Sequence, residues 1–430
     1  MRPLRALPAF ILFTVGAADA EPSRMALPKA IELALRQNLE VHAAEAAEAV
    51  QSDSTRGARG EFGPKLHVDA NVFEWDRPFA VSGFGPQPIV IRDQETSTVT
   101  LTATQQLSAL YPIAEKWQAE KSLDKAAVAD GAAARDEIVY RTTETYLRLL
   151  QAIDLRKIGE DAVKDIAEQE KTARALVGAG TLISADLLRT QVALAQAKQD
   201  LLRAEAAVGG ARAGLATLIG LPVATEIEPE RVDGAKLPAL PPSVEALLPE
   251  AERKRPEVAA ADQRAGAAEH VYRASVAGLL PQIAVGAGYQ HNQGFGFIQQ
   301  ADAAWVAGFL SWDFWEWGAK YYQARAQKGR AKLSGIELLR KRRDVALEVT
   351  RRWLDARASF SAIEVAHEAV AQGREAYRVT RALYENGSAT TTDLLDAQFA
   401  LERSSANDAR TLYDALVAYA ALSRAAGGIE

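Results

Sequence analysis

The chain has 430 residues, of which 48% are hydrophobic and 25% are charged, and its formal net charge is −6. A net negative charge argues against a nucleic-acid partner, because phosphate binding needs clusters of Lys and Arg. The lack of cysteine excludes a disulfide framework, a thiolate metal site and a lipid anchor on an N-terminal cysteine.

The N-terminus resembles an export signal. Arg2 and Arg5 precede an apolar run at 6–17, and Ala18 to Ala20 form an A-x-A cleavage site. This pattern predicts a signal peptide at 1–20. Later in the sequence no stretch of about 20 apolar residues occurs, so a membrane role would have to come from β-strands rather than helices.

Prolines predict where long helices lie. None occurs at 113–221 or at 282–430, and both windows are rich in strong helix formers. The windows predict helical hairpins at 113–220 and 319–426. A helix at 319–384, or one at 113–177, would be about 100 Å long at 1.5 Å per residue.

The tips of the two hairpins are copies of each other. Arg174–Leu194 and Arg381–Leu401 align without a gap, and ten of the 21 positions are identical. This identity predicts a tandem duplication. In each copy a helix ends at a glycine, Gly180 or Gly387, and a second helix follows a Ser or Thr cap. The predicted caps are Ser184 in the first copy and Thr391 or Thr392 in the second.

The duplication extends to the domain organisation. We predict a first repeat at 21–221, a connector at 222–243 and a second repeat at 244–430. Each repeat opens with short helices, continues with two strands and ends with its long hairpin. The predicted strands are 64–75, 96–111, 281–292 and 303–315.

The predicted strands alternate apolar residues with polar or small ones. Leu66, Val68 and Val72, for example, alternate with His67 and Asp69. About ten residues with this period suit the strands of a membrane barrel, although a half-buried soluble sheet has the same period. Aromatic residues near the strand ends are typical of a membrane-interface girdle. These are Trp75, Tyr289, Trp305, Trp312, Trp315 and Trp317.

Four strands are too few to close a barrel alone. The smallest known membrane barrels have about eight strands, and open sheet edges are not tolerated in lipid. The pattern therefore predicts that several chains share one barrel, and three chains with four strands each would give twelve.

Together, the signal peptide, the duplication and the two strands per half resemble the TolC family of outer-membrane efflux and secretion channels. Three local segments also resemble this family: A-I-E-L-A-L-R-Q-N at 30–38, R-P-E-V at 255–258 and W-D-F-W-E-W-G at 312–318. The resemblance implies a mainly α fold with a small β part. Three chains would form an α-barrel of coiled-coil hairpins, joined to a shared 12-stranded transmembrane β-barrel.

The resemblance also implies a function. The expected protein is a homotrimeric exit duct in the outer membrane, with its helical part in the periplasm. It would contact outer-membrane lipid, a periplasmic adaptor and an inner-membrane transporter, and would need no cofactor. The alternative, which rests on the residues alone, is a soluble periplasmic coiled-coil scaffold.

Asp393 and Asp396 match the family's aspartate-lined periplasmic entrance. They are three residues apart, so both project from one helix face, and three chains would bring six carboxylates together. Such a ring attracts cations, and crowding of like charges raises the pKa of its members. The alternative role for Asp393 is stabilisation of a helix start. For Asp186, the equivalent in the first copy, the stabilising role is favoured, because Arg189 replaces the second aspartate.

The family closes its entrance with a tyrosine and an arginine near the second tip. The tyrosine matches Tyr384 and its acidic partner matches Asp186. Ala389 stands where the family has the arginine, so another contact would have to close the entrance, with Arg189 and Arg381 as candidates.

The hairpin tips match the place where adaptors dock in the family. Their small residues allow close approach of another helix, although small residues are also typical of turns. The candidate docking residues are Gly178, Gly180, Thr181, Gly387, Ser388 and Ala389.

No catalytic motif occurs in the sequence, so we predict that the protein is not an enzyme. The five histidines lack the spacing of metal ligands. His367 falls in the apolar seam of the second long helix, where we expect it to be packed.

Overall fold

The computed structural model describes residues 23–83, 88–231, 237–296 and 299–428, so the predicted signal peptide at 1–20 lies outside the described residues. The helices are α1 (Leu27–Gln37), α2 (Leu39–Gly60), α3 (Leu110–Gly178), α4 (Ser184–Leu218), α5 (Leu248–Lys254), α6 (Pro256–Ala277), α7 (Ala319–Glu385) and α8 (Thr391–Ala426). The strands are β1 (Ser23–Met25), β2 (Lys65–Glu74), β3 (Phe79–Val81), β4 (Ile89–Arg92), β5 (Glu95–Gln106), β6 (Ile227–Pro229), β7 (Gln282–Gln293) and β8 (Asp302–Ser311).

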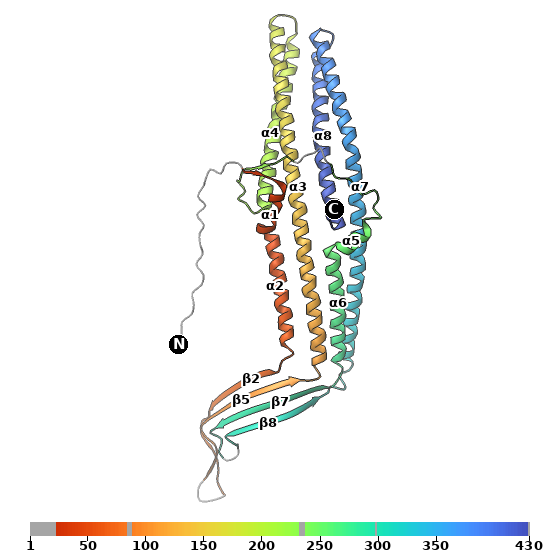
Figure 1. Cartoon of the computed structure of the whole chain (residues 1–430). Coiled ribbons are helices and arrows are strands. Elements are labelled where there is room, and N and C mark those ends of the chain that lie inside the picture. Colours follow the sequence, from red (N-terminus) through yellow and green to blue (C-terminus); the bar gives the residue numbers. More distant parts are fainter. Residues whose placement is uncertain (1–22, 84–87, 232–236, 297–298, 429–430) are drawn as a thin grey trace. The chain divides into compact units, whose positions relative to one another are not determined.

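Two long helices, α3 with 69 residues and α7 with 67, dominate the chain (Figure 1). Each is followed by a shorter antiparallel return helix, α4 or α8. Pro112 lies in the first turn of α3, where a missing N–H removes no helical hydrogen bond. The long helices therefore occupy the stretches that lack proline, as the composition predicts.

Both hairpins turn at a glycine in the left-handed conformation. The φ angle is +75° at Gly180 and +72° at Gly387. After each glycine the chain forms a Schellman motif: the amide of Thr181 donates to the Leu176 carbonyl at 3.0 Å, and that of Ser388 to the Leu383 carbonyl at 2.8 Å. Left-handed φ favours glycine because it has no Cβ, so the predicted helix ends are confirmed.

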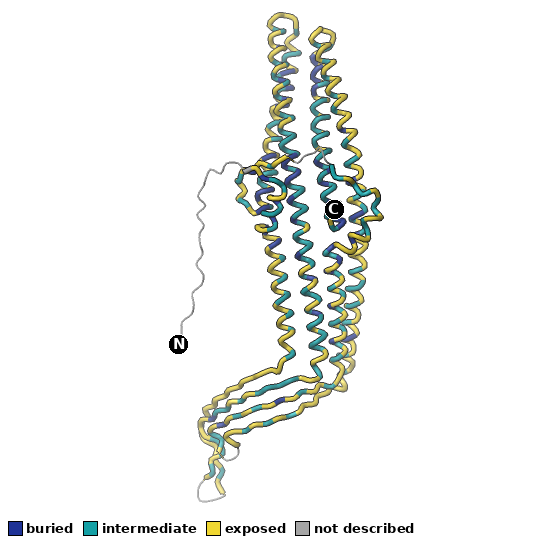
Figure 2. Tube along the Cα trace, viewed as in Figure 1, coloured by how far each residue is buried: buried dark blue, intermediate teal, exposed yellow. Residues whose placement is uncertain are grey.

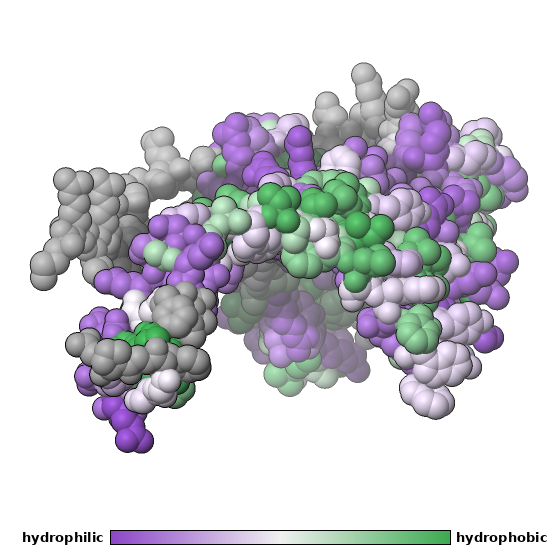
Figure 3. Space-filling view, turned by 90° about the horizontal axis from the view of Figure 1, so that it is seen from below, coloured by the Kyte–Doolittle hydropathy of each residue, from purple (hydrophilic) through white to green (hydrophobic). Residues whose placement is uncertain are grey.

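The central sheet has four antiparallel strands in the order β2-β5-β7-β8. The register brings all the alternating apolar residues to one face. In one row across the sheet, Val68 pairs with Leu101 and Leu101 with Tyr289. Exposed apolar side chains on this face include Leu66, Val68, Val72, Ile283, Val306 and Leu310. Figure 3, a view from the end of the molecule that carries the strands, shows hydrophobic side chains gathered in a band.

The opposite face carries threonines, glycines and the aromatic residues Phe73, Trp305 and Phe309. Trp305 lies on this face in register with Gly288, and a Cβ added to Gly288 would be 2.5 Å from the indole. Trp305 also packs edge-to-face on Phe309, with ring centroids 6.2 Å apart. The prediction that Trp305 belongs to a girdle at the strand ends is therefore wrong: its odd number places it opposite the apolar face, where it covers glycine.

Two predicted strands end earlier than expected. The strand predicted at 96–111 ends at Gln106, because the amides of Leu107 and Ser108 both turn to the Ile283 carbonyl and α3 begins at Leu110. The strand predicted at 303–315 ends at Ser311. Trp317 and Gly318 both have left-handed φ angles, which redirect the chain into α7.

The described chain forms two compact units, and each contains parts of both sequence halves. Among the described residues, the first consists of those within 23–38, 141–238 and 359–417, and the second of those within 39–140, 239–358 and 418–428. In the first unit, the buried Tyr146 hydroxyl bonds to the carbonyls of Met25 at 2.8 Å and Glu230 at 2.7 Å. These bonds attach the β1–β6 pair to α3. Figure 2 shows buried residues recurring along the helices.

The second unit has an apolar core with a buried ion network beside it. Ala251, Val258, Val345, Val349 and Ala425 form the buried cluster. Arg255, only 5% exposed, bonds to the Glu257 and Glu348 carboxylates. His367, by contrast, belongs to the first unit, and its side chain is 82% exposed. The expectation that it packs in a seam is therefore wrong for the single chain.

Candidate functional site

The second tip begins α8 with a reciprocal cap between Thr390 and Asp393. The Thr390 hydroxyl accepts from the Asp393 amide at 3.1 Å, and the Asp393 carboxylate accepts from the Thr390 amide at 2.8 Å and its hydroxyl at 2.7 Å. This is the capping-box arrangement with Asp at the acidic position. The cap is therefore Thr390, not Thr391 or Thr392 as predicted, because only Thr390 precedes the first helical residue.

Asp393 and Asp396 both lie on the exposed side of α8, whereas Leu394 and Leu395 between them are buried. Hydrogen bonds donated by Thr390 lower the pKa of Asp393, so its carboxyl is ionised at neutral pH. In one chain the two aspartates therefore form an anionic edge at the start of α8, with Asp393 also stabilising the helix start.

The first tip carries a paired charge instead. An Asp186 carboxylate oxygen lies 3.1 Å from Arg189 Nη1 on the same helix. Helix α4 begins at Ser184 itself, and the residue at the cap position is Ile183, which makes no side-chain cap. The predicted Ser184 cap is therefore wrong. The Arg189 partner neutralises Asp186, so this tip has no counterpart of the anionic edge.

The candidate docking residues lie on the two turns. A Cβ added to Gly178, Gly180 or Gly387 would meet no atom of the described residues within 4 Å. Thr181 is held by its hydroxyl, which donates to the Leu176 carbonyl at 3.0 Å. Ser388 is exposed and Ala389 is half-buried. The open space beside these residues leaves both turns accessible within the described chain.

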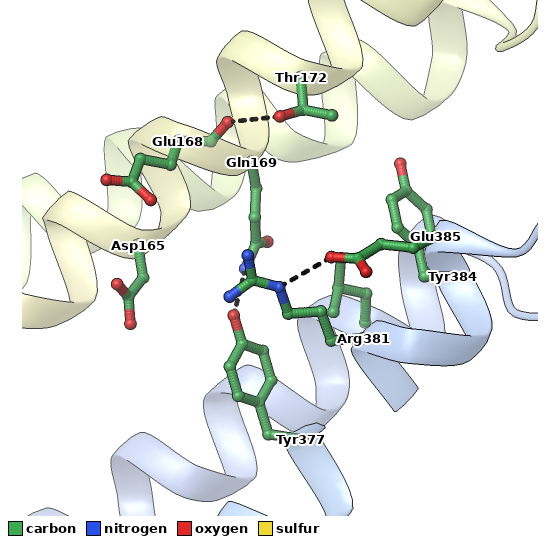
Figure 4. A pocket seen from close by; sticks show the side chains of 9 residues that line it. Asp165, Glu168, Gln169, Thr172, Tyr377, Arg381, Tyr384 and Glu385 are labelled. Atoms are coloured by element: carbon green, nitrogen blue, oxygen red, sulfur yellow. Dashed lines mark hydrogen bonds and ion pairs between the residues drawn. The ribbon is translucent and has the colours of Figure 1, made fainter. Parts of the chain in front are cut away.

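Tyr384 lines a pocket of about 130 Å³ between α3 and α7 (Figure 4). Asp165 and Glu168 of α3 line the opposite wall, so the acidic residues of the first hairpin that share this pocket with Tyr384 come from α3 and not from the Asp186 position. Arg381 extends into the pocket and donates to Glu385 on its own helix at 3.1 Å. Neither Arg381 nor Arg189 makes a described ion pair that joins the hairpins.

One of the polar contacts between the hairpins involves glutamines that sequence reasoning missed. Gln169 Nε2 on α3 donates to Tyr377 Oη on α7 at 3.2 Å and to Gln398 Oε1 on α8 at 3.0 Å. Gln398 Nε2 in turn lies 3.5 Å from the Asp165 carboxylate. One signal could have indicated Gln398: it belongs to the repeated segment, where its equivalent is Gln191.

The described residues contain no cluster of three His, Asp or Glu side chains that could hold a metal ion. Within the same residues, no helix is both long enough and apolar enough to cross a membrane.

The fold is shared by solved outer-membrane channels. VceC from Vibrio cholerae is 19% identical, with a TM-score of 0.79 over 94% of this chain and 96% of that one. CmeC from Campylobacter jejuni is 15% identical, with a TM-score of 0.82 over 99% and 94%. The open state of MtrE from Neisseria gonorrhoeae is 19% identical, with a TM-score of 0.79 over 94% and 89%. The predicted fold class is therefore confirmed: a mainly α chain whose long hairpins join a four-stranded share of a β-barrel.

No curated protein sequence matches the chain. A family model described as outer membrane efflux protein matches residues 30–221 and again 247–428. The two matches fall on the two halves of the chain, which confirms the tandem duplication. Together they cover most of the sequence, so the chain belongs to the outer membrane efflux protein family, and it is an efflux channel protein of the outer membrane and not an enzyme.

Proposed function

We propose that the chain is one subunit of a homotrimeric exit duct that works in a tripartite efflux or type I secretion system. The observation that carries the proposal is the four-stranded sheet with one apolar face. Its edge strands, β2 and β8, have unpaired backbone groups, and such edges cannot face lipid. Joining β8 of each chain to β2 of the next removes every edge and gives twelve strands from three chains.

The two faces of the sheet support this arrangement. The exposed Val, Leu and Ile side chains of one face suit contact with lipid, and the threonines and glycines of the other face suit a water-filled lumen. Exposed aromatic residues directly after β8 suit the membrane interface. They are Trp312, Phe314, Trp315 and Trp317. The long helices then extend into the periplasm, where the tips dock an adaptor that connects the duct to an inner-membrane pump.

The entrance of the duct is the ring formed by Asp393 and Asp396 of three chains. Six carboxylates around a narrow opening attract cations and bind polyvalent cations. Support comes from the exposure of both side chains and from the lowered pKa of Asp393, which keeps its charge at neutral pH. The small residues of the two turns are the docking surface for the adaptor.

Conductance of the purified protein in planar lipid bilayers tests the proposal. We expect a cation-selective channel whose current is reduced by a trivalent cation. Asp396→Asn should weaken both properties without touching the cap at Thr390, and Asp393→Asn combined with it should weaken them further. The matched control is Asp186→Asn at the equivalent position of the first tip. Equal block of the wild type and of the double variant would contradict the aspartate entrance.

The mass of the detergent-solubilised protein tests the assembly separately. We expect about three subunits of 46.3 kDa or slightly less each, because the predicted signal peptide would be removed. A stable single subunit that needs no detergent would contradict the shared barrel.

A further inference from the structure

Two aromatic side chains of β8 lie on the face of the sheet that the proposed barrel turns toward its lumen. The strand register places Trp305 and Phe309 opposite the apolar face that carries Val306 and Leu310. On β5 and β7 the lumen face carries threonine, glutamine, asparagine, alanine and glycine. Large apolar side chains are not expected there, because the inside of a membrane barrel with a water-filled lumen is polar. The pattern of the sheet therefore does not account for this pair.

The two rings form an open corner. Three indole atoms of Trp305 lie 2.5–2.7 Å from the point where a Cβ of Gly288 would stand, so one face of the indole rests on the β7 backbone. Its other face points away from the sheet. The Phe309 ring stands at 90° to the indole, with the ring centroids 6.2 Å apart, and 48% of its surface is exposed. The corner consists of a flat indole and an upright phenyl ring.

This corner fits a flat aromatic molecule. A ring system that stacks on the free face of Trp305 also meets Phe309 edge-to-face, because the two side chains are perpendicular. Offset-stacked and edge-to-face contacts are the arrangements that aromatic rings prefer. A molecule without a flat ring makes neither contact, so the geometry selects for planar aromatic compounds.

Phe73 extends the aromatic surface to the other edge of the sheet. It lies on the same face, near the end of β2 that is remote from the helices, and it is 53% exposed. In the proposed barrel β8 of one chain pairs with β2 of the next, so rings from both chains lie along each junction. Phe309 is near the end of β8 that leads into α7. The rings are therefore spread along the direction of export.

We propose that Trp305 and Phe309 form a subsite in the lumen of the barrel that briefly binds planar aromatic molecules as they leave the duct. Phe73 of the next chain supplies a second contact along the same junction. The inference rests on the proposed function, which turns this face of the sheet toward a lumen. It adds a ligand class and a binding site in the barrel, away from both hairpin tips. One stacking contact strengthens binding by about tenfold, so the subsite holds a ligand without trapping it.

Binding of proflavine, a planar aromatic cation, to the detergent-solubilised protein tests the subsite through the change in dye fluorescence. We expect saturable binding that Trp305→Leu weakens about tenfold and that Trp305→Tyr largely keeps, because tyrosine retains an aromatic face. Phe309→Leu should weaken binding less and gives an independent test at the second ring. An excess of tetraethylammonium, a cation without a ring, should not displace the dye.

The matched control is Trp312→Leu. It removes an exposed tryptophan that lies just beyond the end of β8, outside the lumen face. The variant should bind proflavine as the wild type does. It therefore measures how much of the signal comes from dye in the detergent near the outer surface.

Current recording in planar bilayers shows whether the subsite lies on the path of export. Proflavine should interrupt the current in brief blocks, and Trp305→Leu should shorten the mean block about tenfold. Any block by tetraethylammonium should have the same duration in the wild type and in Trp305→Leu.

The outcomes separate the subsite from the proposed function. Equal proflavine binding by the wild type, Trp305→Leu and Phe309→Leu overturns the subsite, whether or not the protein conducts. An equal loss of binding in Trp312→Leu also overturns it, because the dye is then bound at the detergent-facing surface. Displacement by tetraethylammonium contradicts the aromatic ligand class, and an unchanged block duration in Trp305→Leu contradicts a position on the export path. The absence of any channel in the wild type overturns the proposed function, while dye binding still decides whether the subsite exists.

Discussion

Arg255 supports a quantitative prediction about stability. Its guanidinium donates to the Glu257 carboxylate at 3.0 and 2.8 Å, to Glu348 at 2.8 Å and to the Ala425 carbonyl at 3.1 Å. The side chain is 5% exposed. Arg255→Met removes the cation and leaves the two carboxylates in a partly buried site. Removal of one partner from a buried ion pair costs about 3–5 kcal/mol.

Arg424 reduces the expected cost. Its guanidinium lies 3.2 Å from a Glu348 oxygen and 3.6 Å from a Glu257 oxygen, so it still compensates part of the negative charge. We therefore expect a loss of about 3 kcal/mol, at the lower end of the range. The matched control is Arg253→Met two residues earlier, whose 73% exposed side chain pairs with Glu250. It should change stability by less than about 0.5 kcal/mol.

The pH dependence of unfolding tests the mechanism. Burial is the largest single influence on Glu257 and raises its pKa, but the hydrogen bonds and charge of Arg255, the hydrogen bond from its own backbone and the charge of Arg424 together lower the pKa below 4.5. A carboxyl whose pKa is lower in the folded state contributes stability above pH 4.5, and that stability is lost as the pH falls through the folded value. We therefore expect the difference in free energy of unfolding between wild type and Arg255→Met to decrease below about pH 4.5. Thermal unfolding of the detergent-solubilised protein measures this difference. The predicted role of Arg255 would be refuted if Arg255→Met were as stable as the wild type at pH 7. It would also be refuted if the difference in free energy of unfolding stayed constant down to pH 3.

Three further changes test local structure. Tyr146→Phe removes the hydroxyl from the Met25 and Glu230 carbonyls, although the Met25 carbonyl still accepts from the Glu230 amide, and should cost about 1 kcal/mol, measured by hydrogen exchange at β1. Because burial raises the Tyr146 pKa from 10.0 to about 12, the wild-type advantage should be constant below pH 10 and disappear between these values. Gly387→Ala, at a φ of +72°, should cost about 1–2 kcal/mol in exchange at the end of α7, whereas Gly178→Ala within a helix should be neutral or stabilising. Thr390→Ala removes the cap and should speed exchange of the Asp393 amide, at a cost of about 1 kcal/mol.

Features that depend on local chemistry could be predicted from the sequence. Stretches without proline gave the long helices, and glycine gave the ends of both hairpins, because these residues act on the backbone where they stand. The cap of α8 was placed one or two residues too late, since three threonines in a row can each cap a helix. Trp305 was assigned to the interface girdle by its residue type alone. It is adjacent to Val306 in the strand, so it lies on the opposite face of the sheet.

Contacts across the fold could not be predicted in this way. Gln169 and Gln398 are 229 residues apart, and no local period connects them. The same applies to Arg255 and Ala425, which are 170 residues apart. The alternation of the strands also fitted a soluble scaffold, and it was membership of an outer-membrane family that excluded it.

The repeat contains its own comparison, because the joints and tips of one half have equivalents in the other. At the joints between the short helices, Asn38 donates to the Leu218 carbonyl at 2.9 Å and Arg255 to the Ala425 carbonyl at 3.1 Å. Leu218 and Ala425 are separated by the same 207 residues as the two tips. The two halves therefore keep one architecture at their joints while using different side chains.

At the tips the halves differ in charge as well as in contacts. Arg189 in the first copy neutralises Asp186, whereas its equivalent in the second copy is Asp396, which adds to the charge of Asp393. Glu170 holds Gln191 within the first hairpin, whereas Tyr377 leaves Gln398 to bond across to α3. Both differences act in the same direction. The first hairpin pairs these groups on its own helices, whereas the second hairpin has two exposed acids and a glutamine that bonds to α3.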